Sequence, residues 1–300
     1  MLRAGRGSVA TVTFVRPGTR ARTVEIITAS GRAELERLVA ADPLVNAVVA
    51  ARLATYHSVD PLRFGGVLLG SYAESGLTGA AFNGGNLLPI GGTTDDWVAL
   101  ADQVARGPQV CTSIVGPVDA VSTMWAVLEP RWGPARAIRE QQPLLALTRD
   151  EPVGAEPHPR LRVMHPHELE RYLPAAAAMF REELGISPFD GRSGHSYRRR
   201  VESLLGTGRA FGIVDRDGRM AFKADLGAIT PETCQVQGVW VRPDLRGRGL
   251  GTAGLAAVLQ HALRRAPTVS LYVNDFNLPA RRMYARLGLR EVATLQTVLL

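Results

Sequence analysis

Apolar and polar positions along the chain follow strand and helix periods in an order that occurs twice. In the first half, strands are predicted at 23–30, 65–72, 77–90, 109–115 and 144–148, with helices at 33–41, 43–56, 95–106 and 118–128. In the second half, strands are predicted at 161–164, 210–214, 220–226, 233–241, 268–273 and 291–299, with helices at 166–180, 197–206, 251–264 and 279–287. This order predicts an α/β (α+β) protein with a mixed sheet, in which one architecture is used twice.

A proline-rich stretch separates the two halves. Residues 149–160 hold three prolines and several charges, which predicts a linker. We therefore expect an N-terminal domain over residues 1–150 and a C-terminal domain over 160–300. Ahead of the first strand, residues 1–22 carry five arginines but no apolar signal core, so a loosely ordered tail is expected there.

Composition and charge narrow the classes of function. The chain is 46% hydrophobic, and its formal net charge is +7. Lys223 is the single lysine, so the excess of arginine indicates a codon bias rather than a nucleic-acid surface, although a basic surface still attracts phosphorylated ligands. Cys111 and Cys234 lie far apart without metal-ligand spacing, and no apolar run reaches the roughly 18 residues of a membrane span. We expect a cytoplasmic protein without a metal site, a membrane span or a nucleic-acid partner.

The clearest local pattern joins a strand to a helix through three glycines. Residues 236–241 are apolar and rich in β-branched side chains, and a charged tripeptide with a central proline ends the strand. Gly247, Gly249 and Gly251 follow at alternate positions, and a helix begins near Thr252. Such a turn points backbone N–H groups and the positive end of a helix dipole at one place, which favours an anion such as a pyrophosphate. An ordinary glycine-rich helix entry predicts the same local pattern equally well.

A second signature lies downstream of the glycine turn. The turn reads Val239-Trp-Val-x-Pro-x-x-Arg-Gly-Arg-Gly-Leu-Gly251, and the later segment reads Leu271-Tyr-Val-Asn-x-x-Asn-x-x-Ala-x-x-x-Tyr-x-x-x-Gly288. With both motifs in this order, residues 161–300 resemble the GNAT N-acetyltransferase family. The resemblance implies a mixed sheet whose two central strands splay apart. It also implies transfer of the acetyl group of acetyl-CoA to a primary amine, by direct attack in a ternary complex.

The resemblance also implies roles for individual residues. Backbone groups of Val239 and Val241 would pair with the pantetheine arm, and N–H groups from Arg246 to Thr252 would hold the pyrophosphate. Tyr284 would donate a proton to the leaving thiolate as general acid, unless it is only a core aromatic of its helix. The full set of cofactor-binding candidates is Val239, Trp240, Val241, Arg246, Gly247, Arg248, Gly249, Leu250, Gly251, Thr252, Asn274, Asn277 and Ala280.

The acceptor side lacks the carboxylate that many members of this family carry on the strand before the turn. Gln235 and Gln237 stand there, on one face of the strand, and they can hold a water but cannot act as a base. Glu182, Glu183 and Asp225 are the remaining candidates, and each is equally well explained as a solvated charge. The base therefore stays unassigned, and the acceptor stays open between a small-molecule amine and a protein amine.

The first half is expected to be a degenerate copy of the same fold. Where the glycine turn should fall, the sequence after Cys111 offers Gly116 and Pro117, and the proline removes an N–H donor. We expect residues 1–150 not to bind CoA productively, and instead to shape the acceptor site or to support a homodimer. Two other functions remain open: a non-catalytic sensor of acyl-CoA, and a nucleic-acid-binding protein that uses the arginines.

Overall fold

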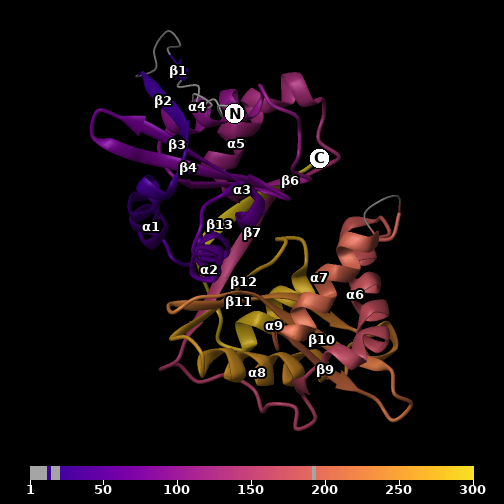
Figure 1. The fold of residues 1–300 in the computed structure, drawn as a ribbon. Coiled ribbons are helices and arrows are strands. Elements are labelled where there is room, and N and C mark those ends of the chain that lie inside the picture. Colours follow the sequence, from indigo (N-terminus) through magenta and orange to yellow (C-terminus); the bar gives the residue numbers. More distant parts are fainter. Residues whose placement is uncertain (1–11, 15–20, 191–193) are drawn as a thin grey trace, which may run out of the picture. The chain divides into compact units, whose positions relative to one another are not determined.

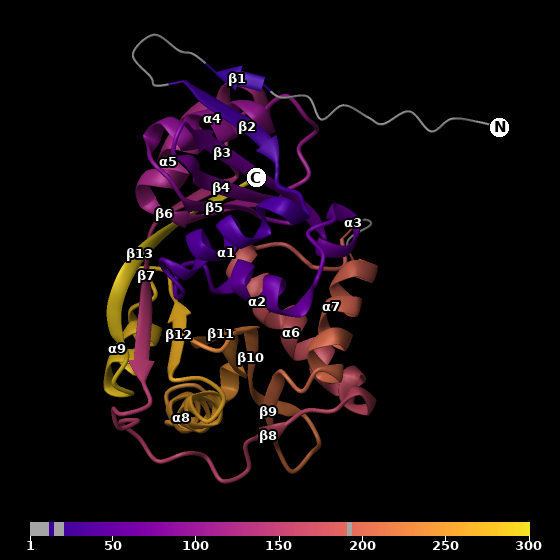
Figure 2. The same cartoon turned by 60° about the vertical axis from the view of Figure 1, so that its left-hand side comes forward.

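The chain forms two units in a computed structural model that describes residues 12–14, 21–190 and 194–300 (Figures 1 and 2). Unit 1 consists of the chain up to Pro143 together with Ala293–Leu300, and unit 2 consists of Leu144–Val292. Whether these units are the separate domains expected at 1–150 and 160–300 stays a prediction. The expected N-terminal tail falls largely outside the described residues. Within them, no helix combines the length and the apolar character needed to cross a membrane.

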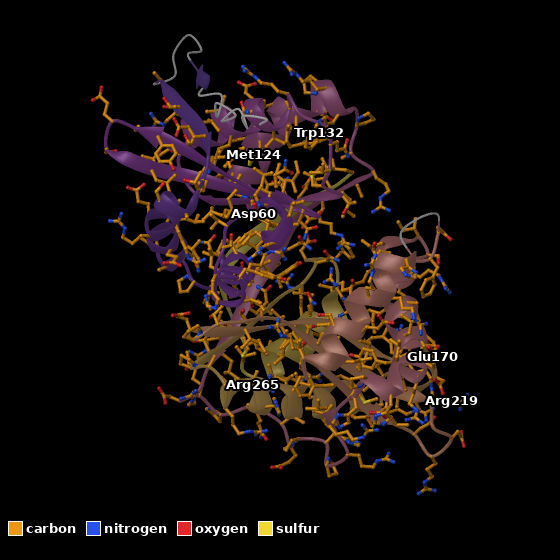
Figure 3. All side chains as sticks on the ribbon, viewed as in Figure 1. Asp60, Met124, Trp132, Glu170, Arg219 and Arg265 are labelled. Atoms are coloured by element: carbon orange, nitrogen blue, oxygen red, sulfur yellow. The ribbon has the colours of Figure 1, made fainter. Side chains whose placement is uncertain are left out.

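Unit 1 is a mixed sheet between two layers of helices. Helices α4 and α5 pack on one face of the sheet, and α1 and α2 pack on the other. Met124, labelled in Figure 3, is fully buried in the first of these layers. The strands lie in the order β1 (Val12–Phe14), β2 (Arg22–Ile26), β3 (Gly66–Ala73), β4 (Gly76–Gly84), β5 (Leu87–Gly91), β6 (Ser113–Pro117) and β13 (Arg290–Leu299). The helices are α1 (Arg32–Ala40), α2 (Ala47–Thr55), α3 (Pro61–Phe64), α4 (Thr94–Val104) and α5 (Val118–Trp132).

Unit 2 has the same layered construction. On one face of its sheet α8 packs against Phe222, and on the other face α6 and α7 cover an apolar cluster around Tyr172. Glu170 and Arg219, labelled in Figure 3, are exposed at its surface. The strands lie in the order β7 (Ala137–Thr148), β12 (Thr268–Tyr272), β11 (Thr233–Val241), β10 (Met220–Ile229), β9 (Ala210–Val214) and β8 (Arg162–Val163). The helices are α6 (Leu169–Leu184), α7 (Gly194–Gly206), α8 (Leu250–Leu263) and α9 (Leu278–Arg286).

Both units repeat one topology. Each contains an antiparallel meander of three strands, β3–β4–β5 in unit 1 and β9–β10–β11 in unit 2. A helix follows each meander, and the next strand is parallel to the last strand of the meander, as β6 is to β5 and β12 to β11. Parallel neighbours require a crossover of this kind. The predicted α/β architecture used twice is therefore confirmed.

The C-terminal strand completes unit 1 rather than unit 2. Residues 295–299 of β13 pair antiparallel with residues 113–117 of β6. In unit 2, residues 144–148 of β7 take the equivalent place and pair antiparallel with β12. Hydrophobic periodicity located both strands, but it carried no information about their partners.

The predicted linker is docked on unit 2. The N–H of Gly154 donates to the carbonyl of Leu287 (3.2 Å), and the N–H of His158 donates to the carbonyl of Ala253 (2.9 Å). A Cβ at Gly154 would lie 2.1 Å from the carbonyl oxygen of Arg286, so the backbones approach each other too closely for any other residue. Residues 149–160 therefore connect β7 to β8 as a segment that is packed on unit 2.

Candidate functional site

The two parallel strands at the centre of unit 2 separate soon after they begin. The register of β11 with β12 covers residues 233–235 opposite 268–270, whereas β11 runs on to Val241. The N–H of Arg242 donates to the carbonyl of Ala221, on the side of β10 (3.0 Å). By alternation, the backbone groups of Val239 and Val241 face away from β10, toward the opening between the strands. This edge of β11 can accept an extended ligand as a further strand would be accepted.

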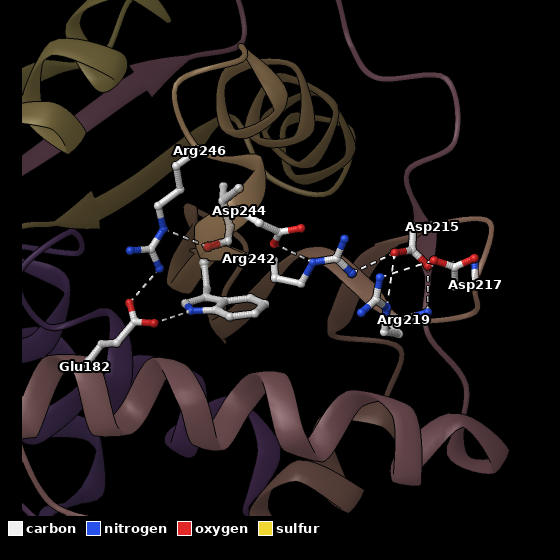
Figure 4. A network of polar contacts seen from close by, with 9 residues as sticks. Glu182, Asp215, Asp217, Arg219, Arg242, Asp244 and Arg246 are labelled. Carbon is white, nitrogen blue, oxygen red and sulfur yellow. Dashed lines mark hydrogen bonds and ion pairs between the residues drawn. The ribbon is translucent and has the colours of Figure 1, made fainter.

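Ion pairs fix the turn that follows β11 (Figure 4). Arg242 donates through Nη1 to Oδ2 of Asp215 and through Nε to Oδ1 of Asp244, and both distances are 2.7 Å. These bonds from Arg242 lower the pKa of both carboxyls below their usual values. Arg246 follows the short helical turn Pro243–Leu245, and its Nε donates to the carbonyl of Val241 (2.9 Å). One of the backbone acceptors expected to contact a cofactor arm thus already has a partner.

Glu182 ties the end of α6 to the same turn (Figure 4). Its Oε2 accepts from Nη2 of Arg246 (2.7 Å), and its Oε1 accepts from Nε1 of Trp240 (3.1 Å). The Glu182 and Arg246 side chains are 42% and 47% exposed, so their ion pair contributes only about 0–1 kcal/mol. Its effect is to orient both groups. The sequence placed Glu182 among the acceptor-side candidates, and the structure places it against two of the cofactor-side candidates.

The three glycines of the turn are required for different reasons. Gly247 and Gly249 have φ angles of 73° and 80°, in the left-handed region, and a Cβ at either position would meet no atom within 4 Å. A Cβ at Gly251 would instead lie 3.1 Å from Cγ2 of Val241 and 3.3 Å from Sδ of Met283. Two glycines therefore shape the turn, and the third allows α8 to pack closely on β11 and α9.

The first turn of α8 leaves backbone donors for a ligand. Gly249 is the N-cap and has no side chain to bond these donors, and the N–H of Ala253 donates to its carbonyl (3.0 Å). In this described stretch, the N–H groups of residues 247–252 have no backbone acceptor, whereas the N–H of Arg246 donates to the carbonyl of Pro243 (3.3 Å). Such a cluster of donors at a helix N-terminus suits an anion. The predicted set of donors from 246 to 252 therefore contracts to 247–252.

Tyr284 lies in the core of unit 2, in the same apolar cluster as Val239 and Val241. Its side chain is 7% exposed. Burial raises the pKa of this phenol, and the negative charge of Glu183 raises it further. Tyr284 therefore keeps its proton at neutral pH, as a proton donor must. Its packing also fits the alternative of a core aromatic, so its role as an acid stays a prediction.

The two asparagines before α9 build the loop that leads into this helix. Oδ1 of Asn277 accepts from the N–H of Ala280 (3.3 Å), which caps the helix. The N–H of Asn277 donates to the carbonyl of Asn274 (3.0 Å). These contacts give Asn277 a structural role, and its contact with a cofactor stays a prediction.

On the sheet face covered by α6 and α7, Asp225 belongs to a buried polar cluster. Its Oδ1 accepts from the hydroxyl of Tyr172, and its Oδ2 accepts from Nζ of Lys223, and both distances are 2.6 Å. Burial, together with the charge of Asp225, raises the pKa of Tyr172 well above its usual value. Because both oxygens of Asp225 are engaged, this carboxylate is poorly suited to serve as a base. The sequence did not predict Lys223 and Tyr172 as its partners, and the one available signal was that Lys223 is the only lysine.

Gln237 lies on the same face as Asp225. Its Oε1 accepts from Nη2 of Arg200 on α7 (3.5 Å), and its side chain covers Gly227, where a Cβ would lie 2.5 Å away. By alternation Gln235, which is 6% exposed, shares this face. Among the described residues, no group of three or more His, Cys, Asp or Glu side chains is placed to hold a metal ion.

Comparison with known protein families identifies this part of the chain. Residues 167–289 match the model of the acetyltransferase (GNAT) family. Residues 167–289 form a GNAT acetyltransferase domain. Residues 66–172 match the model of a domain of unknown function (DUF4081), and a comparison with curated protein sequences gives no significant match. The GNAT fold supports acyl transfer, and its members generally use acyl-CoA.

Solved structures extend the likeness to nearly the whole chain. A GCN5-related N-acetyltransferase from Sphaerobacter thermophilus is 20% identical, with a TM-score of 0.56 over 93% of this chain and 95% of that chain. A tandem GNAT protein from the clavulanic acid biosynthesis pathway is 16% identical, with a TM-score of 0.55 over 93% of this chain and 98% of that chain. A GNAT-family acetyltransferase from Colwellia psychrerythraea is 12% identical, with a TM-score of 0.56 over 92% and 99%. At these identities the likeness shows the fold alone, a GNAT fold with a second copy in unit 1.

The counterpart of the GNAT glycine turn in unit 1 follows β5. The shared topology equates the β11–α8 junction with β5–α4. The predicted location at 111–117 is therefore wrong, because residues 111–117 lead through β6 into α5, and the β6–α5 junction corresponds to β12–α9. At β5–α4, Gly91 and Gly92 have φ angles of 55° and 95°. The N–H and the hydroxyl of Thr93 both donate to Oδ2 of Asp96 (2.8 Å). A carboxylate of unit 1 itself therefore lies where the GNAT domain leaves its donors open.

Proposed function

We propose that unit 2 transfers the acetyl group of acetyl-CoA to a primary amine, which attacks directly in a ternary complex. The observation that supports this most is the combination of three features at the open end of β11. These are the strand edge at residues 239–241, the glycine turn with open N–H groups at 247–252, and the buried phenol of Tyr284. In a GNAT domain, each of these features suits a different part of an acyl-CoA.

The donor side of the proposed site consists mainly of backbone groups. The backbone groups of Val239 and the N–H of Val241, whose carbonyl accepts from Arg246, suit the amide-rich arm. The N–H groups of residues 247–252, with Arg248 beside them, suit the pyrophosphate. When bound, acetyl-CoA supplies a thioester carbonyl activated toward an amine. The raised pKa of Tyr284 keeps a proton on its Oη at neutral pH, and this group would give that proton to the departing sulfur.

Glu183 is the residue that we propose as general base. It is exposed in the last turn of α6. Burial raises the pKa of both Tyr284 and Tyr197, and the negative charge of Glu183 adds to each shift. The charge of Glu183 is therefore felt at the phenol of the proposed acid, which supports this choice. Glu182, which contacts Trp240 and Arg246, and Asp225, which contacts Tyr172 and Lys223, are the alternative candidates. Glu183 would accept a proton from the ammonium of the acceptor, directly or through a water.

The acceptor is a small-molecule amine or a protein amine, and unit 1 either shapes its site or supports a homodimer. A panel of amines, assayed by release of CoA thiol, separates these acceptor classes. If the wild-type protein binds CoA but acetylates no amine, it would be a non-catalytic acyl-CoA sensor. The glutamines at 235 and 237 are the observation that keeps this second candidate open.

The Tyr284→Phe variant tests the proposed acid. It removes only the hydroxyl, so we expect kcat to fall about 100-fold while the Kd for CoA stays within about twofold. Kinetics and calorimetric titration measure the two quantities. Tyr56→Phe, the same chemical change at a tyrosine of unit 1, serves as the control and should keep full turnover. An unchanged kcat in Tyr284→Phe would sink the assignment of the acid.

The base is tested by comparing two adjacent glutamates. Glu183→Gln keeps the shape of the side chain and removes its basicity, so kcat/KM for the amine should fall about 100-fold at neutral pH. Glu182→Gln should instead raise KM for acetyl-CoA by only a few fold, since Glu182 contacts Arg246 and Trp240. Equal effects of the two substitutions on kcat would contradict the choice of Glu183.

A further inference from the structure

A buried charged network surrounds the irregularity in β11 from which the open strand edge continues. Nζ of Lys223 donates to Oδ2 of Asp225 (2.6 Å) and to the carbonyl of Gly238 (3.0 Å). The other oxygen of Asp225 accepts from the hydroxyl of Tyr172 (2.6 Å), which lies on α6. The Lys223 and Asp225 side chains are 1% and 6% exposed, and Tyr172 is fully buried. Three elements, β10, β11 and α6, therefore meet in one network.

The irregularity is a bulge centred on Gly238. In the register of β10 with β11, Asp225 lies opposite Gln237 and Lys223 lies opposite Trp240, so β11 has one residue more than β10 in this interval. Gly238 has a φ angle of 61°, and a Cβ there would lie 2.8 Å from both Nζ of Lys223 and Oδ2 of Asp225. The network is packed directly on this backbone, so a Cβ at position 238 would displace its side chains, and the positive φ angle favours glycine.

The bulge decides which way the following residues face. Before it, Val236 points to the α8 side of the sheet, and after it Trp240 points to the α6 and α7 side while Val239 and Val241 pack toward α8. In a regular strand, Val236 and Trp240 are four positions apart and would lie on one face. The backbone groups that are open on the free edge of β11 are therefore set by the conformation at Gly238.

The chemistry of the cation matches this task. The chain has 35 basic residues, and Lys223 is the only lysine among them. A compact ammonium can donate at once to a carboxylate and to the carbonyl of Gly238, whereas a planar guanidinium needs a wider, flat space. The Sδ of Met179 at 3.6 Å and the Tyr172 ring, 5.3 Å from Nζ to its centroid, enclose the rest of the ammonium. This position requires the shape of lysine as well as its charge.

We propose that Lys223, Asp225 and Tyr172 are positioning residues that hold the bulge at Gly238 and so align the edge of β11 for the arm of an acyl-CoA. This inference rests on the proposed function, because it is the acyl-CoA that uses the edge. The described contacts of the network do not include the proposed acid, Tyr284. Loss of the network should therefore weaken cofactor binding more than it slows the chemical step.

Two variants separate positioning from general stability. Lys223→Met alone leaves the carboxylate of Asp225 buried without its cation, so its melting temperature should fall markedly. The triple variant Lys223→Met/Asp225→Leu/Tyr172→Phe removes every charge and hydroxyl of the network, and its melting temperature should recover toward that of the wild type. It still lacks the donor to Gly238, so we expect its Kd for CoA to be about tenfold higher than that of the wild type. Calorimetric titration with CoA and thermal unfolding supply these data.

Amide hydrogen exchange gives a second measurement that does not depend on a ligand. Residues 238–241 should exchange faster in the triple variant, while the core of α8 keeps its protection. If the triple variant does not fold, Tyr172→Phe, which keeps both charges, should still raise the Kd for CoA two- to fivefold. A folded triple variant with wild-type CoA affinity and wild-type exchange at 238–241 would overturn the inference. Failure of the wild type itself to bind CoA would instead refute the proposed function, and the exchange data would still test the network.

Discussion

At the residue scale, the glycine turn shows how one sequence pattern combines several physical requirements. The spacing of Gly247, Gly249 and Gly251 predicted a close approach to an anion, and the predicted helix does begin there. The structure separates the reasons, because the first two have left-handed φ angles and the third has close neighbours. A sequence shows that a position is glycine, but not which of these constraints selected it.

The left-handed conformation of Gly249 predicts a specific cost of substitution. Gly249→Ala should lower the free energy of unfolding of unit 2 by about 1–2 kcal/mol, because an L-residue is strained at a φ of 80°. Gly206→Ala is the matched control, since a Cβ there also meets no atom within 4 Å but its φ is not left-handed. Urea unfolding compares the two. Equal midpoints for the two variants would show that the backbone at Gly249 does not hold this conformation.

At the element scale, the same helix position has opposite environments in the two units. The first turn of α8 in unit 2 has open N–H groups, whereas α4 in unit 1 begins with Thr93 bonded to Asp96. Burial raises the pKa of Asp96, but hydrogen bonds from Thr78, Thr93 and Ser71 outweigh this and lower it, so this carboxylate stays ionised at the helix N-terminus. Periodicity predicted both helices. It could not reveal which topological position each occupied, and the counterpart turn was therefore misplaced.

The difference between the open N-terminus of α8 and the capped N-terminus of α4 predicts that the chain binds one CoA and not two. An ionised carboxylate at the N-terminus of α4 repels a pyrophosphate, and it already accepts from the N–H and the hydroxyl of Thr93. Calorimetric titration of the full chain should give a stoichiometry of one CoA per chain, and Gly249→Ala should weaken that single site. A stoichiometry of two would mean that unit 1 binds CoA despite Asp96.

At the scale of the whole molecule, the two units are not two consecutive lengths of chain. Ala293–Leu300 belong to unit 1, although they follow directly on unit 2 in the sequence. Val298 is fully buried in the core of unit 1, and Leu295 is 4% exposed. Oγ of Ser122 on α5 donates to Oε1 of Gln296 (2.6 Å). Residues 293–300 thus contribute to the core of unit 1, from which unit 2 separates them in the sequence.

Removal of residues 293–300 should therefore destabilise unit 1 selectively. Each of the buried side chains Leu295 and Val298 contributes about 1.5–3 kcal/mol, and β6 would lose its partner strand. Hydrogen exchange of the truncated chain should show lost protection in β6 and α5, with α8 protected as before. Lost protection confined to unit 2 would contradict this division of the chain.

The sequence by itself determined the helices and strands, the repeat of one architecture, and the glycine turn together with the Asn/Tyr motif downstream of it. These features are local, because periodicity and glycine spacing report on neighbouring residues. Only the tertiary structure decided the partner of the last strand, the true counterpart turn in unit 1, and the network of Lys223, Asp225 and Tyr172 around Gly238. Each of these depends on segments that are far apart in the chain, whose pairing is set by the summed contacts of the folded state rather than by any local pattern.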